Sequence, residues 1–494
     1  MKVQNTLITV LVLFVIIIVP EQPLSGQGYG GPLDFHGIDN VTLHSAAVRG
    51  FGGVTIGIRN EIGLMFQNPA LLQSVSGLQV SIGGLQQSRD ITQEQNFGPV
   101  RNYPNLSLLL EGLTHLIPDP VESPRRPSTQ DTVQRPYDDI QPNWSSSNSR
   151  TLPVQAMIAL PFSVSGFNMV AGAGFVEYAD LDHYFQNNNV LSPDIMSHSP
   201  IPAFRPTDDN PEKVDWYQSI RSREGSVYGY GAALSGVFER YNISLGVSGM
   251  ILNGSTDDFE QQVRRGQLTF FSNAFRVDSV YSRITRTGTS EYSGLEFTIS
   301  GIHYGEYVSV GFSMKPPTTI TRTFSMNIAT DTTGNPTTST LSGEDEIKFP
   351  WRGSAGIAIR PHDRLLFALE YELRPYDSVR YTDSDGNESE PWLSSSLVRA
   401  GVAYELTEWL ILRAGMRGDA EVFESKGNPI GGDPVTHTIY SGGVGISFAG
   451  VRLNVTYENS SLQYEDIWGT VLSKNKDKRH TIVADISYTI PWLR

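Results

Sequence analysis

Hydrophobic and polar residues alternate with a period of two along most of the chain after residue 77. The alternation is clearest in segments 242–251, 409–417, 451–458 and 482–490, where Val, Ile, Leu, Ala, Met or Tyr occupies nearly every second position. Alternation of this kind places one set of side chains on each face of a β-strand. The pattern therefore predicts an all-β chain.

The length and spacing of the expected strands point to a membrane barrel. A tilted membrane strand needs about 9–11 residues, whereas strands of soluble sheets mostly have about 5–6. The connections alternate between short and long, as in an up-and-down barrel with tight periplasmic turns and long external loops, and unlike a Greek-key sandwich. We therefore predict a transmembrane antiparallel up-and-down β-barrel of about 14 strands. The expected strands cover residues 77–87, 151–163, 167–178, 226–239, 241–252, 289–302, 305–315, 344–360, 364–379, 396–405, 409–418, 437–448, 451–463 and 480–490.

The N-terminus predicts export. Residues 1–26 contain Lys2 and then an apolar run over 7–19. This run is shorter than the about 20 residues of a membrane helix and is typical of a secretory signal peptide. An uncleaved anchor helix is the alternative. An exported chain without a later apolar helix can reside in a membrane only through β-strands.

Residues 27–76 do not follow the strand pattern, and we predict that they form an N-terminal hatch or plug. The segment is rich in glycine and precedes the first strand, so it is not an external loop. It either lies in the periplasm or folds into the lumen. A barrel of about 14 strands encloses more volume than its own side chains fill, which favours the lumen. Residues 77–494 are then the barrel with its long extracellular loops.

Composition and motifs narrow the function classes. The net charge of −15 argues against a nucleic-acid partner, because such proteins contact phosphate mainly through basic residues. The chain has no cysteine, so disulfides and thiolate metal sites are excluded. It lacks the G-x-S-x-G and H-E-x-x-H signatures, and we expect neither an enzyme nor a cofactor or metal. Residues 383–388 resemble part of a calcium loop, but a plain Asp-Gly turn is the better interpretation.

Three segments of the N-terminal region carry a family resemblance. They are Ala46 to Val54 (AAVRGFGGV), Asn60-Glu61 and Met65 to Leu72 (MFQNPALL). Together they resemble the hatch signature of the FadL/TodX family, and segments 397–404 and 410–416 resemble that family's paired late strands. The chain departs from the family pattern at Leu71-Leu72 and in its last residues, which are not a terminal aromatic.

The resemblance implies an outer-membrane passive transporter for hydrophobic small molecules, namely long-chain fatty acids or hydrocarbons. It implies a monomer in the outer membrane of a double-membraned bacterium, in contact with lipid and lipopolysaccharide. Similar folds and hatch motifs occur in PorV-like accessory proteins of type IX secretion. A secretion accessory or scaffold with a secretion-system partner is therefore one alternative, and a general porin for polar solutes is another.

Three groups of residues are candidates for function. Asn68, Pro69 and Ala70 belong to the hatch that occludes the lumen in the family, and an ordinary turn before a strand is the alternative. The loop predicted at 179–225 carries Phe204, Trp216 and Tyr217, which we expect to capture apolar substrate; a lid that packs only on other loops is the alternative. Loop 253–288 is a second candidate for capture.

Charged residues on the expected strands form the third group. A charge facing lipid costs about 2–4 kcal/mol at the bilayer midplane, so these side chains are predicted to face the lumen. They either grip the hatch or a substrate carboxylate, or form a self-neutralising network without a ligand. The lumen-facing set is Arg352, Glu370, Arg399, Glu405, Arg413, Arg417 and Arg452, together with Asn454, Glu458 and Asp485.

Overall fold

The computed structural model describes most of the chain. The predicted signal peptide and Phe204 lie outside the described residues. Those described are residue 35 and residues 37–42, 45–97, 116–118, 134–136, 143–192, 207–271, 275–278, 282–332, 335–424, 434–468 and 471–490.

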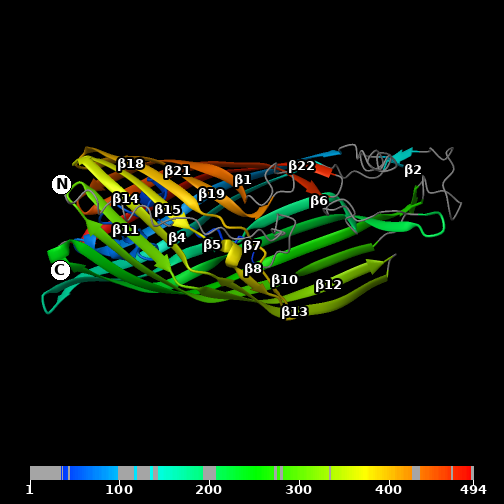
Figure 1. Ribbon diagram of the computed structural model, residues 1–494, viewed down its shortest axis with the longest axis horizontal. Helices are drawn as coiled ribbons and strands as arrows, with labels where there is room; N and C mark the ends of the chain where they lie inside the picture. The colour runs from blue at the N-terminus through cyan, green and yellow to red at the C-terminus, as the bar shows by residue number, and fades with distance from the viewer. Residues whose placement is uncertain are drawn as a thin grey trace, which may run out of the picture.

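Within these residues, 14 antiparallel strands form a closed barrel (Figure 1). Each strand pairs with two neighbours, and the last strand pairs with the first, so the ring has no free edge at this level. The prediction of an all-β barrel of about 14 strands is confirmed. In order around the wall the strands are β1 (Leu78–Phe97), β4 (Trp144–Val164), β5 (Phe167–Asp180), β7 (Glu212–Phe238), β8 (Ile243–Phe270), β10 (Ser282–Tyr304), β11 (Val308–Lys315), β14 (Arg352–His362), β15 (Leu365–Leu373), β18 (Leu397–Thr407), β19 (Leu410–Glu424), β20 (Pro434–Phe448), β21 (Val451–Trp468) and β22 (Val471–Ile490).

Shorter strands continue the wall toward the end of the barrel where the strands are longest (Figure 1). Proline residues, which lack an N–H for the ladder, mark two of the breaks, at Pro316-Pro317 and at Pro350. The extensions are β6 (His183–Ser192), β9 (Phe275–Asp278), β12 (Thr318–Thr332), β13 (Asn335–Phe349), β16 (Arg380–Thr382) and β17 (Glu388–Ser389); β2 (Leu116–Pro118) and β3 (Gln134–Pro136) form a separate two-stranded sheet.

Several strands are much longer than the alternation predicted. β8 runs to Phe270, whereas the pattern ended at residue 252, and β7 begins at Glu212 rather than 226. The added residues are mostly polar, and their apolar members are irregularly spaced, so they carry no period-two signal. Trp216 and Tyr217 consequently lie in β7, paired with β6 and β8, and their predicted placement in a loop was wrong.

An apolar band surrounds the outside of the barrel. Large hydrophobic side chains that point outward are exposed on nearly every strand, and Ile251 of β8 is 64% exposed. A soluble monomer rarely exposes so large a contiguous apolar surface. A lipid-facing band about 25 Å tall is the signature of a membrane barrel. Representative members are Ile82, Ile158, Phe297, Phe312, Leu369, Val398, Tyr457 and Ile486.

The described helices are short, and none is long and apolar enough to cross a membrane. They are α2 (Ala46–Gly50) and the 3-10 turns η1 (Ile62–Leu64), η2 (Pro69–Ser74), η3 (Glu239–Tyr241) and η4 (Tyr376–Ser378).

The hatch, defined here as residues 45–75, lies inside the barrel and forms its core. Phe51, Ile56 and Leu71 have no exposed surface, and they pack on wall residues such as Ile302 and Leu366. The hydrophobic core of the chain therefore lies between the hatch and the wall. The lumen of so large a barrel is too wide for the side chains of the wall alone to fill.

Candidate functional site in the barrel interior

Polar side chains of the wall hold the hatch at several points around the barrel. On β10, Ser300 Oγ accepts from the Ala70 N–H at 2.8 Å, and on β8 the Ser244 hydroxyl donates to the Ala70 carbonyl at 2.7 Å. Farther round, Thr55 donates to Glu370 of β15 through its N–H and its hydroxyl, at 2.7 and 2.8 Å. Hatch backbone groups, which have no strand partner, are thus paired by the wall.

Helix α2 is anchored on the opposite part of the wall. The Ala46 N–H donates to Asp485 at 2.6 Å, and Asn454 donates to the same carboxylate at 2.7 Å. Arg413 in turn donates to Asn454 at 3.0 Å, and Arg452 to the carbonyl of Asn60 at 3.0 Å. A carboxylate at the start of a helix satisfies free N–H groups, so Asp485 stabilises α2 in place.

Asn68, Pro69 and Ala70 form the start of η2 and lie against the wall. Pro69 occupies the first position of the turn, where a missing N–H costs nothing. Gly246 of β8 permits the contact, because a Cβ at Gly246 would lie 2.3 Å from the Ala70 nitrogen. The Asn68 amide is fully buried, and neither of its polar atoms has a partner among the described residues. Whether the segment acts as a hinge stays a prediction.

Most of the predicted lumen-facing charges lie inside the barrel. Arg352, Glu370, Arg399 and Arg413 are buried; Arg417 bonds Glu458 and Arg452 bonds the hatch. Glu405 is exposed, on the same end of β18 as the tight turn to β19. Sequence reasoning did not single out Glu296, although it shares a face with Thr298 and Ser300. Its position in the alternation of β10, on the same face as these two polar residues, was the sequence signal that marked it as lumen-facing.

The interior charges form small clusters in which each charge has more than one partner. Glu296 forms ion pairs with Lys315 and with Arg352, the latter at 2.8 Å. It also accepts a hydrogen bond from the Tyr178 hydroxyl at 2.8 Å. Glu458 forms ion pairs with Arg49 of the hatch at 2.8 Å and with Arg417 of β19 at 2.5 Å. Buried charges of this kind need such partners, because desolvation costs several kcal/mol per ion.

Other clusters have two carboxylates around one cation. Arg399 contacts both Glu370 and Glu372, and Arg150 contacts Glu177 at 2.7 Å and Asp180 at 2.9 Å. The clusters with two cations carry an excess positive charge, and the clusters with two carboxylates carry an excess negative charge. Together they are close to neutral, as expected for a largely self-neutralising lumen.

A cavity of about 200 Å³ with many charged side chains in its lining lies between the hatch and the wall, and we call it the charged cavity. Residues of the N-terminal segment, including Thr42, Arg49 and Gln67, line one side of it. Its cationic lining residues are Arg49, Arg150, Lys315, Arg352, Arg374, Arg399, Arg417 and Arg479, and its acidic ones are Asp39, Asp180, Glu372, Asp419 and Glu458.

A second cavity, of about 240 Å³, lies beside a seam in the wall. The β4–β5 ladder ends at the pair Gln155–Val176. Beyond this pair, within the described part of the chain, β4 bonds only β1, and β6 bonds only β7. Arg150, with Gln87 and Asp180, lines both cavities, so its ion pairs separate the seam from the charged cavity.

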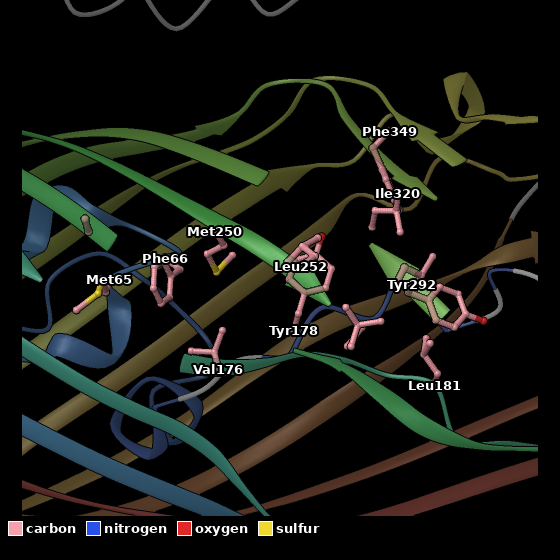
Figure 2. Close-up of a cluster of buried hydrophobic side chains, with 14 of the residues drawn as sticks. Met65, Phe66, Val176, Tyr178, Leu181, Met250, Leu252, Tyr292, Ile320 and Phe349 are labelled. Atoms are coloured by element: carbon pink, nitrogen blue, oxygen red, sulfur yellow. The ribbon is translucent and has the colours of Figure 1, made fainter. Parts of the chain in front are cut away.

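The apolar part of the interior is a packed cluster, shown in Figure 2. It begins at Met65 and Phe66 of the hatch and continues along the wall through Met250 and Leu252 to Phe349. Phe35, before the hatch, packs into the same cluster, with its ring 6.0 Å from that of Tyr292. The cluster is filled by the chain's own side chains rather than by an open apolar cleft.

Asp39, in the N-terminal segment, should make stability depend on pH. Burial raises its pKa to about 6, against the attraction of Arg374. The folded state therefore favours the protonated carboxyl, and stability falls as pH rises from about 4 to about 6. We expect Asp39→Asn to stabilise the protein by about 1–3 kcal/mol at pH 8 and by little at pH 3.5. Thermal unfolding at both pH values, with the exposed Asp363→Asn as control, measures this; an equal effect at both would contradict it.

Among the described residues, no three His, Asp or Glu side chains form a group that could hold a metal ion.

Comparisons with known proteins connect the chain to a fold. No protein-family model matches it, and no curated protein matches it. A solved Pseudomonas aeruginosa FadL homologue is 12% identical with a TM-score of 0.56, covering 91% of this chain and 99% of its own. The CymD monoaromatic hydrocarbon channel is 12% identical with a TM-score of 0.51, covering 92% and 100%.

The P. putida toluene transporter TodX is 11% identical with a TM-score of 0.52, covering 90% of this chain and 97% of its own. These similar structures are channels or transporters rather than enzymes. The identities are low, so the likeness is one of fold. The chain has the 14-strand barrel fold of the FadL/TodX outer-membrane hydrophobic-compound channels.

Proposed function

We propose that the chain is a passive outer-membrane channel for hydrophobic small molecules such as long-chain fatty acids or hydrocarbons. The observation that carries the proposal is a closed 14-strand barrel with its N-terminal hatch held inside, in the fold of channels described for hydrocarbons and toluene. The outer membrane of a double-membraned bacterium is the proposed location, reached through a signal peptide at residues 1–26.

The buried apolar cluster supplies the route. It forms a continuous apolar lining from Phe349 near the outer extensions to Met65 at the hatch. Met65 and Met250 are unbranched and flexible, so they adapt to a guest at low cost. A substrate captured outside would displace these side chains and then pass when the hatch shifts or the wall opens. Capture by Phe204, Trp216 and Tyr217 is part of this proposal.

Native mass spectrometry with lipid extraction, on protein purified in mild detergent, tests the proposal. We expect co-purified fatty acid or hydrocarbon, and its loss in the double variant Phe204→Ala, Trp216→Ala. The exposed Tyr307→Ala, in a tight turn, should retain it. An empty barrel that stays empty when incubated with dodecanoate or toluene would contradict the proposal.

A scaffold role, such as a PorV-like secretion accessory, is the second candidate. The firm attachment of the hatch favours it, because bonds at Ala46, Thr55 and Ala70 join the hatch to wall strands far apart around the barrel. Under this alternative the barrel stays closed and the outer extensions bind a protein. Cross-linking in the native outer membrane would give one defined partner if it holds, and only lipid contacts if the transport proposal holds.

A further inference from the structure

We propose that the charged cavity is a binding site for small hydrophilic organic anions, with dicarboxylates as the best-matched class. The charged cavity borders the apolar cluster at Tyr376, and the site adds a second ligand class to the proposed function. It stands whether or not hydrophobic molecules also cross the barrel.

The surface that faces the cavity is positive although the interior as a whole is balanced. Eight arginine or lysine side chains and five carboxylates line it, an excess of three positive charges. Several carboxylates that neutralise these cations lie behind the cavity wall instead. Glu296, Glu177 and Glu370 are fully or almost fully buried and are not part of the lining. In a low-dielectric cleft, an excess of one sign of charge among the lining residues attracts ions of the opposite sign.

Arginine side chains supply most of the cations in the lining. Arg352 and Arg399 are 4% and 9% exposed and line the cavity, and each also pairs with a buried carboxylate of the wall. The fork of an arginine matches the two oxygens of a carboxylate, so an oxyanion is the ligand that suits such a lining.

Glu372 already shows which group the cavity accepts. Its carboxylate contacts Arg399 and also feels the attraction of Arg374, Lys315 and Arg352. A side chain of the protein thus occupies one anion position among four cations. Lys315, Arg352 and Arg399 come from three different wall strands, and Arg374 follows β15. A free carboxylate in the cavity would therefore meet several cations at once.

The size of the cavity suits a small solute. Its volume of about 200 Å³ is far above the about 10–15 Å³ that one water molecule needs, so a solute of the size of succinate has room. The second cavity, at the β4 seam, is polar and shares Gln87, Arg150 and Asp180 with it. Arg150 and its ion pairs lie between the two cavities.

Calorimetric titration of the full-length protein in detergent tests the proposal with three probes of matched length. Succinate, 1,4-diaminobutane and butane-1,4-diol are all four-carbon chains with a polar group at each end, and at neutral pH they are respectively a dianion, a dication and uncharged. We expect succinate to bind and the other two to give no heat, and we expect binding to weaken with added salt. Binding of the diamine equal to that of succinate would overturn the proposal, and so would an absence of succinate binding at millimolar concentration.

Two variants test the location of the site, and each leaves the neighbouring buried carboxylate with an arginine partner. Lys315→Gln leaves Arg352 on Glu296, and we expect about tenfold weaker succinate binding. Glu372→Gln removes the internal carboxylate and leaves Arg399 on Glu370, so binding should tighten about tenfold. Arg283→Gln, in an exposed pair away from the cavity, is the control and should leave binding unchanged. Equal effects of all three variants would overturn the assignment.

Dodecanoate separates this site from the apolar route. If it leaves the succinate isotherm unchanged, the cavity selects hydrophilic anions as proposed. If it competes with succinate, the cavity is a carboxylate contact of the hydrophobic route, and the separate site is overturned. An empty barrel in the lipid-extraction experiment would contradict only the proposed function, because it does not involve succinate.

Discussion

Gly415→Val is expected to push the hatch away from the wall and open the barrel to ions. An ideal Cβ at Gly415 of β19 would lie 2.2 Å from the Gly52 nitrogen and 2.4 Å from the Gly52 Cα. Gly52 lies directly against the wall, because its own Cβ position would be 2.2 Å from the carbonyl oxygen of Ala400 on β18. Valine at 415 therefore leaves no room for the hatch backbone. Planar-bilayer recording should show a closed wild type and steady conductance for the variant.

Gly442→Val is the matched control for this experiment. Gly442 lies on the neighbouring strand β20, and a Cβ there would meet nothing within 4 Å. We expect this variant to stay closed. A Gly415→Val barrel that is folded, as judged by its heat-modifiable migration, yet as closed as wild type would show that the hatch does not depend on this contact.

Glu458→Gln should cause the largest loss of stability among single substitutions in the lumen. Glu458 is 4% exposed and is the shared partner of Arg49 in the hatch and Arg417 in the wall. Removing its charge leaves two buried guanidinium groups short of a counter-ion, and breaking a buried pair in this way costs about 3–5 kcal/mol. We expect a lower midpoint of thermal unfolding and a leak in bilayer recordings.

The control for Glu458→Gln lies on the same strand. Glu465 is half exposed and lies 4.0 Å from Lys474, and an exposed pair of this kind is worth about 0–1 kcal/mol. Glu465→Gln should change the unfolding midpoint little and leave the barrel closed. If the two substitutions have equal effects, burial of the Arg49–Glu458–Arg417 cluster does not hold the hatch.

The barrel was predictable where lipid imposes a pattern on the sequence. Outward positions inside the apolar band must be hydrophobic, so alternation identified the membrane portions of strands such as β21 and β22. Beyond the band both faces meet water or polar groups. In β8, Thr256 and Asp258 face inward while Ser255 and Asp257 lie beside them, so no alternation marks the strand. The extensions of β7 and β8 were therefore taken for loops.

The interior was predictable in its residue types but not in its pairings. The cost of charge in lipid placed Arg352, Arg399 and Arg413 inside. Their partners depend on the register of the wall and on the path of the hatch. Arg49 and Glu458, for example, are 409 positions apart in the chain. The packed apolar cluster was also not expected, because filling by Phe35 and Met65 follows from the three-dimensional path of the N-terminal segment.

Uptake of radiolabelled dodecanoate and toluene tests the central claim most directly. The chain would be expressed in a Gram-negative host that lacks other channels of this fold, where lipopolysaccharide slows these solutes. The account predicts faster uptake than in cells with an empty plasmid, without an energy source, and equal uptake for the control Gly442→Val. Uptake no faster than with the empty plasmid, with the folded barrel present in the outer membrane, would contradict it.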